Sequence, residues 1–496
     1  MAARSSAEIL DGLVEPGTFR SWDVPPDLAA FSAEYRAELL AARKASGCDE
    51  AVVTGEAMVG GHCVAVIVSE FGFIGGSVGA ATAARIVRAL ELATERGLPL
   101  VGGLASGGTR MQEGTAAFVC MQDIAAAFMR HRARLLPSVV FLCHPSFGGA
   151  LASWGSLATV TIAEANAAIG LLGPRIYRAV VGQTLPLGIQ RAEHLAELGL
   201  VDAVAPFEEF GPRATAALEL LCGPDRLPLP SEGAAASPPD GREAAPGAMP
   251  AVGAMPGPSA MPSPADPLER SRRPGRAGVR ELIARLPEPV LWLRGSASAE
   301  NGPTVLCIAR IGGVRALIVG QDRAASDPRY GVADLRLARE GIHLAEWLGL
   351  PVVTVVDTPG AELSVAAEEG GLAREIANTL GAMAARSVPA VTLLLGEGCG
   401  AAAIALFGGD VVIAAEGSWL AALPLEGAAD ILYGDGALAV RAARAQRVAA
   451  AELLQDGIVD RIVAEPQDDA VALAEDMLSA CAQELARLVR TRGEAA

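Results

Sequence analysis

Runs of consecutive apolar residues alternate with longer mixed stretches along most of the chain. Residues 139–143 (VVFLC) are apolar at successive positions rather than at every second one, and residues 391–395 (VTLLL) are so except for one threonine. Continuous apolar strands are typical of a parallel sheet that helices cover on both faces. The pattern therefore predicts α/β units.

The same order of predicted elements occurs twice. Residues 89–114 predict a helix, a turn at 97–99, a buried strand and a glycine turn, and residues 341–370 repeat that order. Further along, residues 136–153 are matched by residues 388–405. A repeat of such long period predicts two copies of one domain.

A segment of different composition separates the two copies. Residues 223–278 are dense in Pro, Gly, Ala and Ser and have neither a helical nor a strand period. Such a composition predicts a flexible linker, with a partner-binding segment as the alternative. The expected domains are therefore residues 1–222 and 279–496.

Composition and charge exclude several classes of protein. No apolar run reaches the ~18 to 20 residues that cross a bilayer, and the N-terminus lacks the apolar core of a secretory signal, so we expect a cytoplasmic protein without a membrane partner. A net charge of −17 argues against nucleic-acid binding. The eight cysteines form no CxxC pair, which argues against a disulfide framework and a zinc site.

Glycine-marked corners carry the candidate chemistry. Where the strand at 139–143 leads into an alanine-rich helix, backbone N–H groups lack helical partners, and Gly148 and Gly149 let a ligand atom approach them. These amides are candidates for an oxyanion hole, although glycines there can also simply permit tight packing. The second copy places Gly400-Ala401-Ala402 in the same slot. Two such corners suit the transfer of a group between two carbonyl compounds.

The motifs of both copies resemble one known family. FGFIGGSVGAATAARIVRALE, ASGGTRMQEG and HPSFGGALASWGSLA resemble the β subunit of the bacterial acetyl-CoA carboxylase carboxyltransferase. YGVADLRLAREGIHLAEWLGLPVVTVVDTPGAE, GEGCGAAAIAL and LLQDGIVDRIVAEP resemble its α subunit. The resemblance implies two crotonase-like domains in tandem, with a site between a β-type and an α-type domain.

The resemblance also implies an activity and its partners. The reaction would move CO2 from carboxybiotin, held on a biotin carboxyl carrier protein that works with an ATP-dependent biotin carboxylase, to acetyl-CoA, giving malonyl-CoA for fatty acid or polyketide synthesis. Because the separate subunits pair as dimers of β–α pairs, a homodimer is expected. No zinc ribbon is expected, since Cys48 is the first cysteine.

Site residues follow from the resemblance position by position. Gly148 and Gly149 match one pair of hole-forming residues, assigned to the acyl-CoA, and Ala401 and Ala402 match the other, assigned to biotin. Gly107, Gly108 and Gly360 match the neighbouring turns. Arg110 and Arg175 are candidates for contacts to the CoA phosphates on other grounds, because a phosphate needs a fixed positive charge that an acidic protein otherwise lacks. Either arginine could instead form an ordinary ion pair.

Other residues near the corners have structural alternatives. Cys143 and Cys399 are interpreted as buried thiols rather than nucleophiles. His144 is expected to fix a turn, and Glu113 and Glu397 could satisfy helix-start N–H groups, so none stands out as the base.

Two departures from the family leave other functions open. Ala401 and Ala402 stand where the α subunits have glycines, and Glu362 falls in a stretch that normally reads Tyr-Pro-Gly, which puts acyl selectivity and biotin access in question. A fused malonate decarboxylase subunit and a catalytically degenerate scaffold of a carboxylase complex are the alternatives. A hydratase of the crotonase group fits two fused domains less well.

Overall fold

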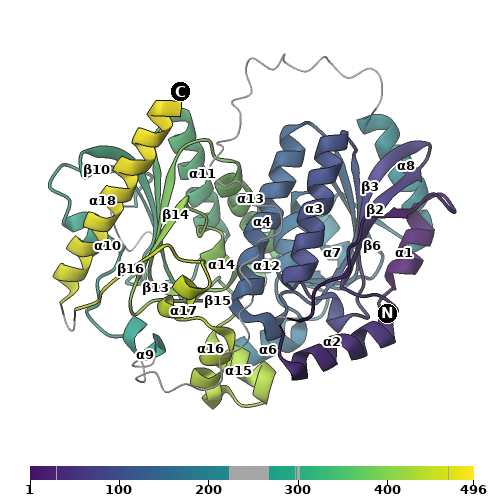
Figure 1. Ribbon diagram of the computed structural model, residues 1–496, viewed down its shortest axis with the longest axis horizontal. Helices are drawn as coiled ribbons and strands as arrows, with labels where there is room; N and C mark the ends of the chain where they lie inside the picture. Colours follow the sequence, from purple (N-terminus) through teal and green to yellow (C-terminus); the bar gives the residue numbers. More distant parts are fainter. Residues whose placement is uncertain (30, 223–266, 297, 299–301, 467–468, 496) are drawn as a thin grey trace.

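The chain forms two α/β domains that lie side by side (Figure 1). The structure, a computed structural model, describes residues 1–29, 31–222, 267–296, 298, 302–466 and 469–495. Most of the predicted linker, residues 223–266, lies outside the described residues. Its last part contains α9 (Pro267–Ser271), and there the Ser271 hydroxyl accepts the indole N–H of Trp419 at 2.9 Å.

Each domain is built on one sheet, and the two sheets have the same order. In the described residues the first sheet runs β1-β2-β3-β4-β5-β6-β8 with β7 beside β5, and the second runs β9-β10-β11-β12-β13-β14-β16 with β15 beside β13. Strands from β3 and from β11 onward are parallel, and the outer ones are antiparallel. The predicted tandem of two α/β, crotonase-like domains is therefore confirmed.

The strand bounds show how closely the copies match. The first sheet comprises β1 (Arg20–Ser21), β2 (Val52–Val59), β3 (His62–Ser69), β4 (Leu100–Ser106), β5 (Ser138–Phe147), β6 (Val160–Glu164), β7 (Ile169–Gly170) and β8 (Ala203–Ala205). The second comprises β9 (Leu291–Trp292), β10 (Thr304–Ile311), β11 (Val314–Gln321), β12 (Val352–Thr358), β13 (Ala390–Cys399), β14 (Val411–Ala415), β15 (Trp419–Ala421) and β16 (Arg461–Val463).

Helices cover both faces of each sheet, as the apolar strands predict. The helices of the first domain are α1 (Ser6–Leu13), α2 (Ala33–Ser46), α3 (Ala80–Arg96), α4 (Gly114–Ala133), α5 (Gly148–Ala150), α6 (Pro174–Val181), α7 (Ala192–Glu197) and α8 (Phe210–Leu221). Those of the second, after α9, are α10 (Val279–Ala284), α11 (Val332–Leu348), α12 (Val365–Glu369), α13 (Leu372–Ala385), α14 (Gly400–Ile404), α15 (Leu425–Tyr433), α16 (Ala439–Gln446), α17 (Ala450–Gln455) and α18 (Ala470–Ala495).

The largest hydrophobic core joins the two domains. It contains Phe118 and Phe128 of α4 together with Ile376 and Leu380 of α13, and it reaches the inner faces of both sheets. Each sheet has a separate core on its outer face, under α1 and α8 in one domain and under α10 and α18 in the other. The inner helices α4 and α13 therefore pack against each other at the domain boundary (Figure 1).

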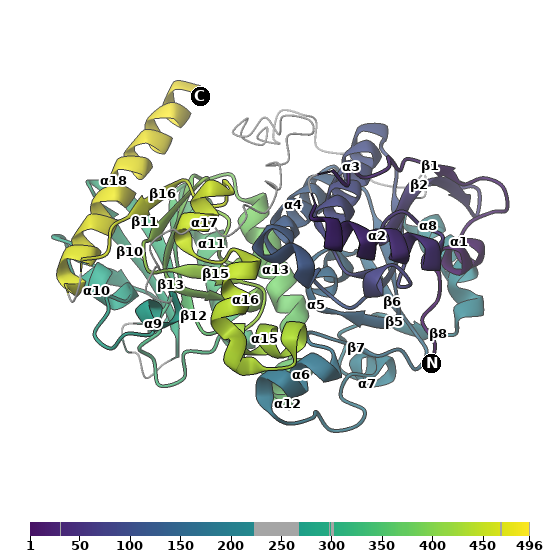
Figure 2. The same cartoon turned by 60° about the horizontal axis from the view of Figure 1, so that its bottom comes forward.

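Two short helices close the lower side of this boundary. Turning the molecule brings α6 and α15 forward, where they lie together below α13 (Figure 2). A Cβ added at Gly427 of α15 would lie 2.8 Å from a methyl group of Val180 on α6, so the contact is close. These helices therefore cover one side of the space between the domains.

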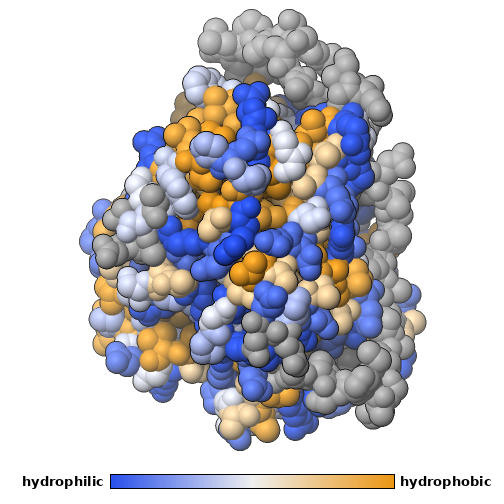
Figure 3. All heavy atoms as spheres, turned by 90° about the vertical axis from the view of Figure 1, so that its left-hand side faces the viewer, coloured by the Kyte–Doolittle hydropathy of each residue, from blue (hydrophilic) through white to orange (hydrophobic). Residues whose placement is uncertain are grey.

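The outer face of the second domain does not form one apolar surface. It shows hydrophobic and hydrophilic side chains in separate patches (Figure 3). Helix α18 buries Leu473, Met477 and Leu485 at helical spacing against the sheet. Among the described helices, none combines the length and the apolar character that a bilayer crossing needs.

Candidate active site

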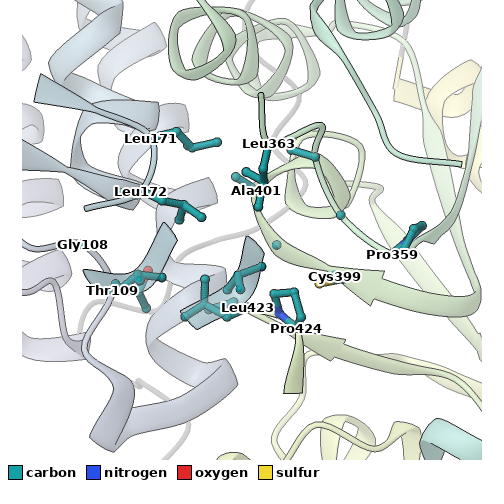
Figure 4. A pocket seen from close by; sticks show the side chains of 18 of the residues that line it. Gly108, Thr109, Leu171, Leu172, Pro359, Leu363, Cys399, Ala401, Leu423 and Pro424 are labelled. Atoms are coloured by element: carbon teal, nitrogen blue, oxygen red, sulfur yellow. The ribbon is translucent and has the colours of Figure 1, made fainter. Parts of the chain in front are cut away.

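One cavity of about 590 Å³ lies between the domains, and both glycine corners open into it. Gly108, Thr109, Leu171 and Leu172 approach it from the first domain, and Pro359, Cys399 and Ala401 approach it from the second (Figure 4). The parts of the lining that belong to the corners and their neighbouring turns are Gly107, Gly108, Gly148, Gly149, Gly360, Gly400 and Ala401. The two corners of one chain thus face a shared space.

The same irregularity precedes both corners. In each domain the pairing of two parallel strands shifts register near their ends, between Leu104 and Ser106 on β4 and between Val356 and Thr358 on β12. The hydroxyl that ends each strand then accepts the N–H of the glycine two residues on, at 3.1 Å for Gly108 and 3.2 Å for Gly360. Both glycines have positive φ, 113° and 127°. A hydroxyl residue followed by a glycine two positions later therefore builds the turn in both copies.

At the first corner only Gly149, the second residue of the predicted pair, has an amide that can serve a ligand. The Gly148 N–H donates to the Leu171 carbonyl at 2.9 Å, so the prediction that it forms the oxyanion hole is corrected. Gly149 is the second residue of α5, where an N–H has no intrahelical acceptor. Gly148 instead permits the close packing, because its φ is 71° and an added Cβ would lie 2.6 Å from the Gly108 Cα.

At the second corner the predicted pair shifts by one residue. Gly400 begins α14 with a φ of 65° and is therefore the counterpart of Gly148, which makes Ala401 the counterpart of Gly149. Ala402 is fully buried and outside the cavity lining, and its carbonyl accepts the side-chain N–H of Gln321 at 2.9 Å. Ala401 therefore lines the cavity, and the part predicted for the Ala402 amide stays a prediction.

The cavity wall is mainly apolar, and sequence reasoning missed most of it. Side chains from the segments around α4, α6, α12 and α15 supply it, namely Met111, Phe118, Met121, Leu171, Leu172, Ile176, Val180, Val181, Leu363 and Leu423. These residues come together only when the domains pack. Only the segments after β7 and β15, which supply residues such as Leu171, Ile176 and Leu423, occupy matching places in the two copies, and that match is the signal the repeat offers.

Charged residues reach the cavity from a single loop, between β11 and α11. Arg323 pairs with Glu397, and Arg329 forms a two-bond pair with Asp327, with nitrogen–oxygen distances of 2.9 and 2.7 Å. This loop, QDRAASDPRYG, aligns with a glycine-rich loop of the first copy, so its extra charges were a visible signal. Both arginines therefore line the cavity as members of ion pairs.

The two arginines predicted to contact the CoA phosphates differ in exposure. The Arg110 side chain is fully buried and pairs with Glu50 at 2.5 Å and Glu113 at 3.3 Å, so it cannot reach a CoA phosphate and that prediction is wrong. Arg175 is exposed at the start of α6, two residues after Gly173 of the cavity wall. It therefore keeps a cation near the cavity edge.

The remaining candidates make structural contacts with neighbouring segments. Glu113 accepts the N–H of Ala80 at 2.6 Å, at the start of α3, whereas Glu397 lies within β13 and pairs with arginines instead of capping a helix. His144 accepts the N–H of Ala168 through Nδ1 at 3.1 Å. Glu362 accepts the hydroxyl of Ser364 at 2.7 Å and is outside the cavity lining.

The two cysteines at the corners are buried thiols. Burial raises the pKa of Cys143, and it raises the pKa of Cys399 to about 12. A thiol with such a pKa stays protonated near neutral pH and is a poor nucleophile. In the described part of the chain, no cluster of His, Cys, Asp and Glu side chains is suited to hold a metal ion.

A buried carboxyl group behind the second corner makes stability depend on pH. Burial raises the pKa of Asp357 to about 7, against the opposing effect of the Arg276 and Arg323 guanidinium groups. Because this pKa lies above that of the unfolded chain, the contribution to stability is complete below the unfolded pKa and is lost as the pH rises through about 7.

We therefore expect Asp357→Asn to flatten the pH dependence of stability. The free energy of unfolding should fall less between about pH 5 and about pH 8 in the variant than in the wild type. Denaturant unfolding across this range measures the difference, and Asp11→Asn, at an exposed position of α1, is the control. An unchanged slope in Asp357→Asn would contradict the assignment.

The two matching α/β domains and the cavity between them belong to a carboxyl transferase, as comparison with family models shows. Residues 5–215 match the family described as "Carboxyl transferase domain", and residues 262–494 match "Acetyl co-enzyme A carboxylase carboxyltransferase-like". The chain belongs to the carboxyltransferases of biotin-dependent acyl-CoA carboxylases, in which it is a fused β/α type. The family resemblance seen in the sequence is thereby confirmed.

Named relatives span nearly the whole chain. A "Probable biotin-dependent acyl-coenzyme A carboxylase beta3 subunit" of Mycobacterium tuberculosis is 42% identical over 95% of this chain and 91% of its own length. The "Acetyl-coenzyme A carboxylase carboxyl transferase subunits beta/alpha" of Saccharopolyspora erythraea is 34% identical over 98% and 86%. A solved structure of transcarboxylase 12S covers 96% of this chain and 89% of its own, at 21% identity and a TM-score of 0.39.

Proposed function

We propose that the protein transfers a carboxyl group from carboxybiotin to the α carbon of acetyl-CoA and so forms malonyl-CoA. The observation that carries the proposal is the convergence of both corners on one cavity within one chain. Carrier-bound carboxybiotin supplies the carboxyl group and a nitrogen that can take the substrate's α proton. Acetyl-CoA is named by several relatives that are 34–35% identical, whereas the relatives at 42% identity are named only as acyl-CoA carboxylase subunits.

In this proposal the corners stabilise negative charge on two carbonyl oxygens. When the α proton leaves acetyl-CoA, charge develops on the thioester oxygen, and the Gly149 amide is the donor assigned to it. The Ala401 amide is assigned to the oxygen of the biotin ring. Donors already in place for developing charge lower the barrier more than donors that must reorient. Gly108 and Gly360 keep the neighbouring turns free of side chains, so both substrates can approach.

The donor set fits biotin as a substrate. The second corner offers a backbone amide beside a cavity wall of apolar side chains. Ala401, the second residue of α14, adds only a methyl group there. A ring with one polar edge suits such a wall. Cys399, which lies close by, contributes a neutral surface because its thiol is protonated.

The remaining substrate and partner contacts extend the proposal. Arg175 is assigned to a phosphate of CoA, since it is exposed beside the cavity and an anion needs a fixed positive charge. The biotin carboxyl carrier protein and biotin carboxylase are the proposed protein partners. The expected homodimer remains part of the proposal, although both corners already meet within one chain.

The reverse reaction tests the proposal directly. Purified protein with malonyl-CoA should release acetyl-CoA only when free biotin or a biotinylated carrier is added. Turnover on a malonyl carrier-protein thioester but not on malonyl-CoA would favour a malonate decarboxylase. The absence of turnover with either would favour a scaffold. Parallel assays with methylmalonyl-CoA show whether acetyl-CoA or propionyl-CoA is the preferred product.

A further inference from the structure

Glu368 is a buried carboxylate that reaches from the second domain to the first. It lies on α12, is 8% exposed, and has no ion-pair partner among the described residues. Its oxygens accept the N–H of Leu171 at 3.2 and 3.4 Å and the side-chain N–H of Gln190 at 3.0 Å. Burying a carboxylate without a cation costs free energy, which these hydrogen bonds offset only in part. Such a residue therefore points to a functional role.

These hydrogen bonds hold the segment that supports the first corner. The Leu171 carbonyl accepts the Gly148 N–H at 2.9 Å, and Gln190 donates to the next carbonyl, that of Leu172, at 2.8 Å. Leu171 and Leu172 also form part of the cavity wall. Displacement of this segment would therefore move the wall and the Gly148 backbone together.

The first domain makes a similar contact in the opposite direction. At the start of α4, the Thr115 hydroxyl donates to the Leu420 carbonyl at 2.9 Å and to the Gln446 carbonyl at 3.1 Å, beside β15. Strand β15 pairs with β13 as β7 pairs with β5, so each domain fastens the strand that leads into the other domain's cavity wall. The first domain uses a neutral hydroxyl for this contact, and the second uses a carboxylate.

We propose that Glu368 is a positioning residue for carboxyl transfer, which fixes the Leu171–Leu172 segment so that the Gly148-Gly149 corner is held in its reactive position. The inference rests on the proposed function. It accounts for a buried acceptor that is hydrogen-bonded to Leu171 and Gln190 of the first domain. A corner displaced by about 1 Å loses on the order of a hundredfold in rate, so the hydrogen bonds of Glu368 affect turnover more than binding.

The test compares three variants of the full chain. Glu368→Ala removes the acceptor, Glu368→Gln keeps an acceptor oxygen without charge, and Glu369→Gln changes the next residue, which bonds His194 of the first domain at 2.9 Å. Biotin-dependent decarboxylation of malonyl-CoA gives kcat and KM. Hydrogen exchange followed by mass spectrometry reports the backbone amides of residues 170–173, a readout independent of activity.

We expect kcat to fall at least about tenfold in Glu368→Ala with KM for malonyl-CoA changed less than about threefold, because a misplaced catalytic group affects the transition state more than the ground state. Exchange at residues 170–173 should rise in the same variant. Glu368→Gln should restore most of the turnover and the protection, and Glu369→Gln should match the wild type in both.

Other results would overturn the inference. A kcat in Glu368→Ala that equals the wild type's, an equal loss in Glu369→Gln, or unchanged exchange at residues 170–173 each contradicts it. If Glu368→Ala does not fold, Glu368→Asp, whose shorter side chain draws the carboxylate away from Leu171, takes its place. A wild type without turnover would reject the proposed function instead, and the exchange measurement would still decide whether Glu368 holds the segment.

Discussion

Replacing Gly148 by alanine is expected to lower kcat for biotin-dependent malonyl-CoA decarboxylation by about a hundredfold or more, the loss typical of a displaced oxyanion-hole donor. An alanine Cβ at this position would lie 2.6 Å from the Gly108 Cα, a backbone atom that cannot turn away. The left-handed φ of 71° adds strain for any residue with a side chain. Steady-state kinetics of the reverse reaction measures the effect.

A matched control separates strain from displacement of the corner. Gly97 also has a left-handed φ, 66°, but an added Cβ there meets nothing within 4 Å. Gly97→Ala should therefore cost some stability and leave kcat unchanged. Thermal unfolding of both variants shows whether they fold, and a folded Gly148→Ala variant with wild-type kcat would remove the first corner from the mechanism.

A bulky side chain at the second corner is expected to act on the other substrate. Ala401→Trp places an indole where the cavity now has one methyl group, and it should lower kcat/KM for free biotin by about a hundredfold or more, as expected when a substrate is displaced by an ångström or so. The KM for malonyl-CoA should change little, since the Gly149 corner belongs to the other domain. Initial rates measured with each substrate varied in turn distinguish the two effects.

The smallest possible change at the same position is its control. Ala401→Gly keeps the amide and removes only the methyl group, so it should retain the activity of the wild type and bind biotin at least as well. If Ala401→Trp raises the KM for malonyl-CoA and leaves kcat/KM for biotin unchanged, the assignment of the two substrates to the two corners is reversed. If it impairs neither, the second corner takes no part in the reaction.

The features that the sequence predicted correctly are local or repeated ones. Apolar strands, the duplicated order of elements and the strand-to-helix corners are short-range patterns, and the packing of helices on both sheet faces follows from them. Gly148 and Gly400 begin matched helices, and both have a left-handed backbone. The repeated glycine in the sequence already indicated this shared conformation. The offset at Ala402 arose because a resemblance supplied the pair, whereas the internal repeat already aligned Gly400 with Gly148.

The features that sequence reasoning missed depend on contacts between distant residues. Arg110 carries the right charge for a phosphate, but its partner Glu50 lies 60 positions earlier in the chain and removes it from solvent. The apolar wall and the role of Glu368 exist only where the two domains meet. A pattern along one chain reports which residues are apolar or charged, and it does not report which domain they will touch.

The shared core has a consequence for how the two halves exist. Helices α4 and α13 bury each other's apolar faces in a single cluster that reaches both sheets. Either half on its own would present that face to water, at a cost in proportion to the apolar area uncovered. Each half therefore depends on the other for its burial. Because both are carried in one polypeptide, the β-type and α-type halves are always synthesised in equal number.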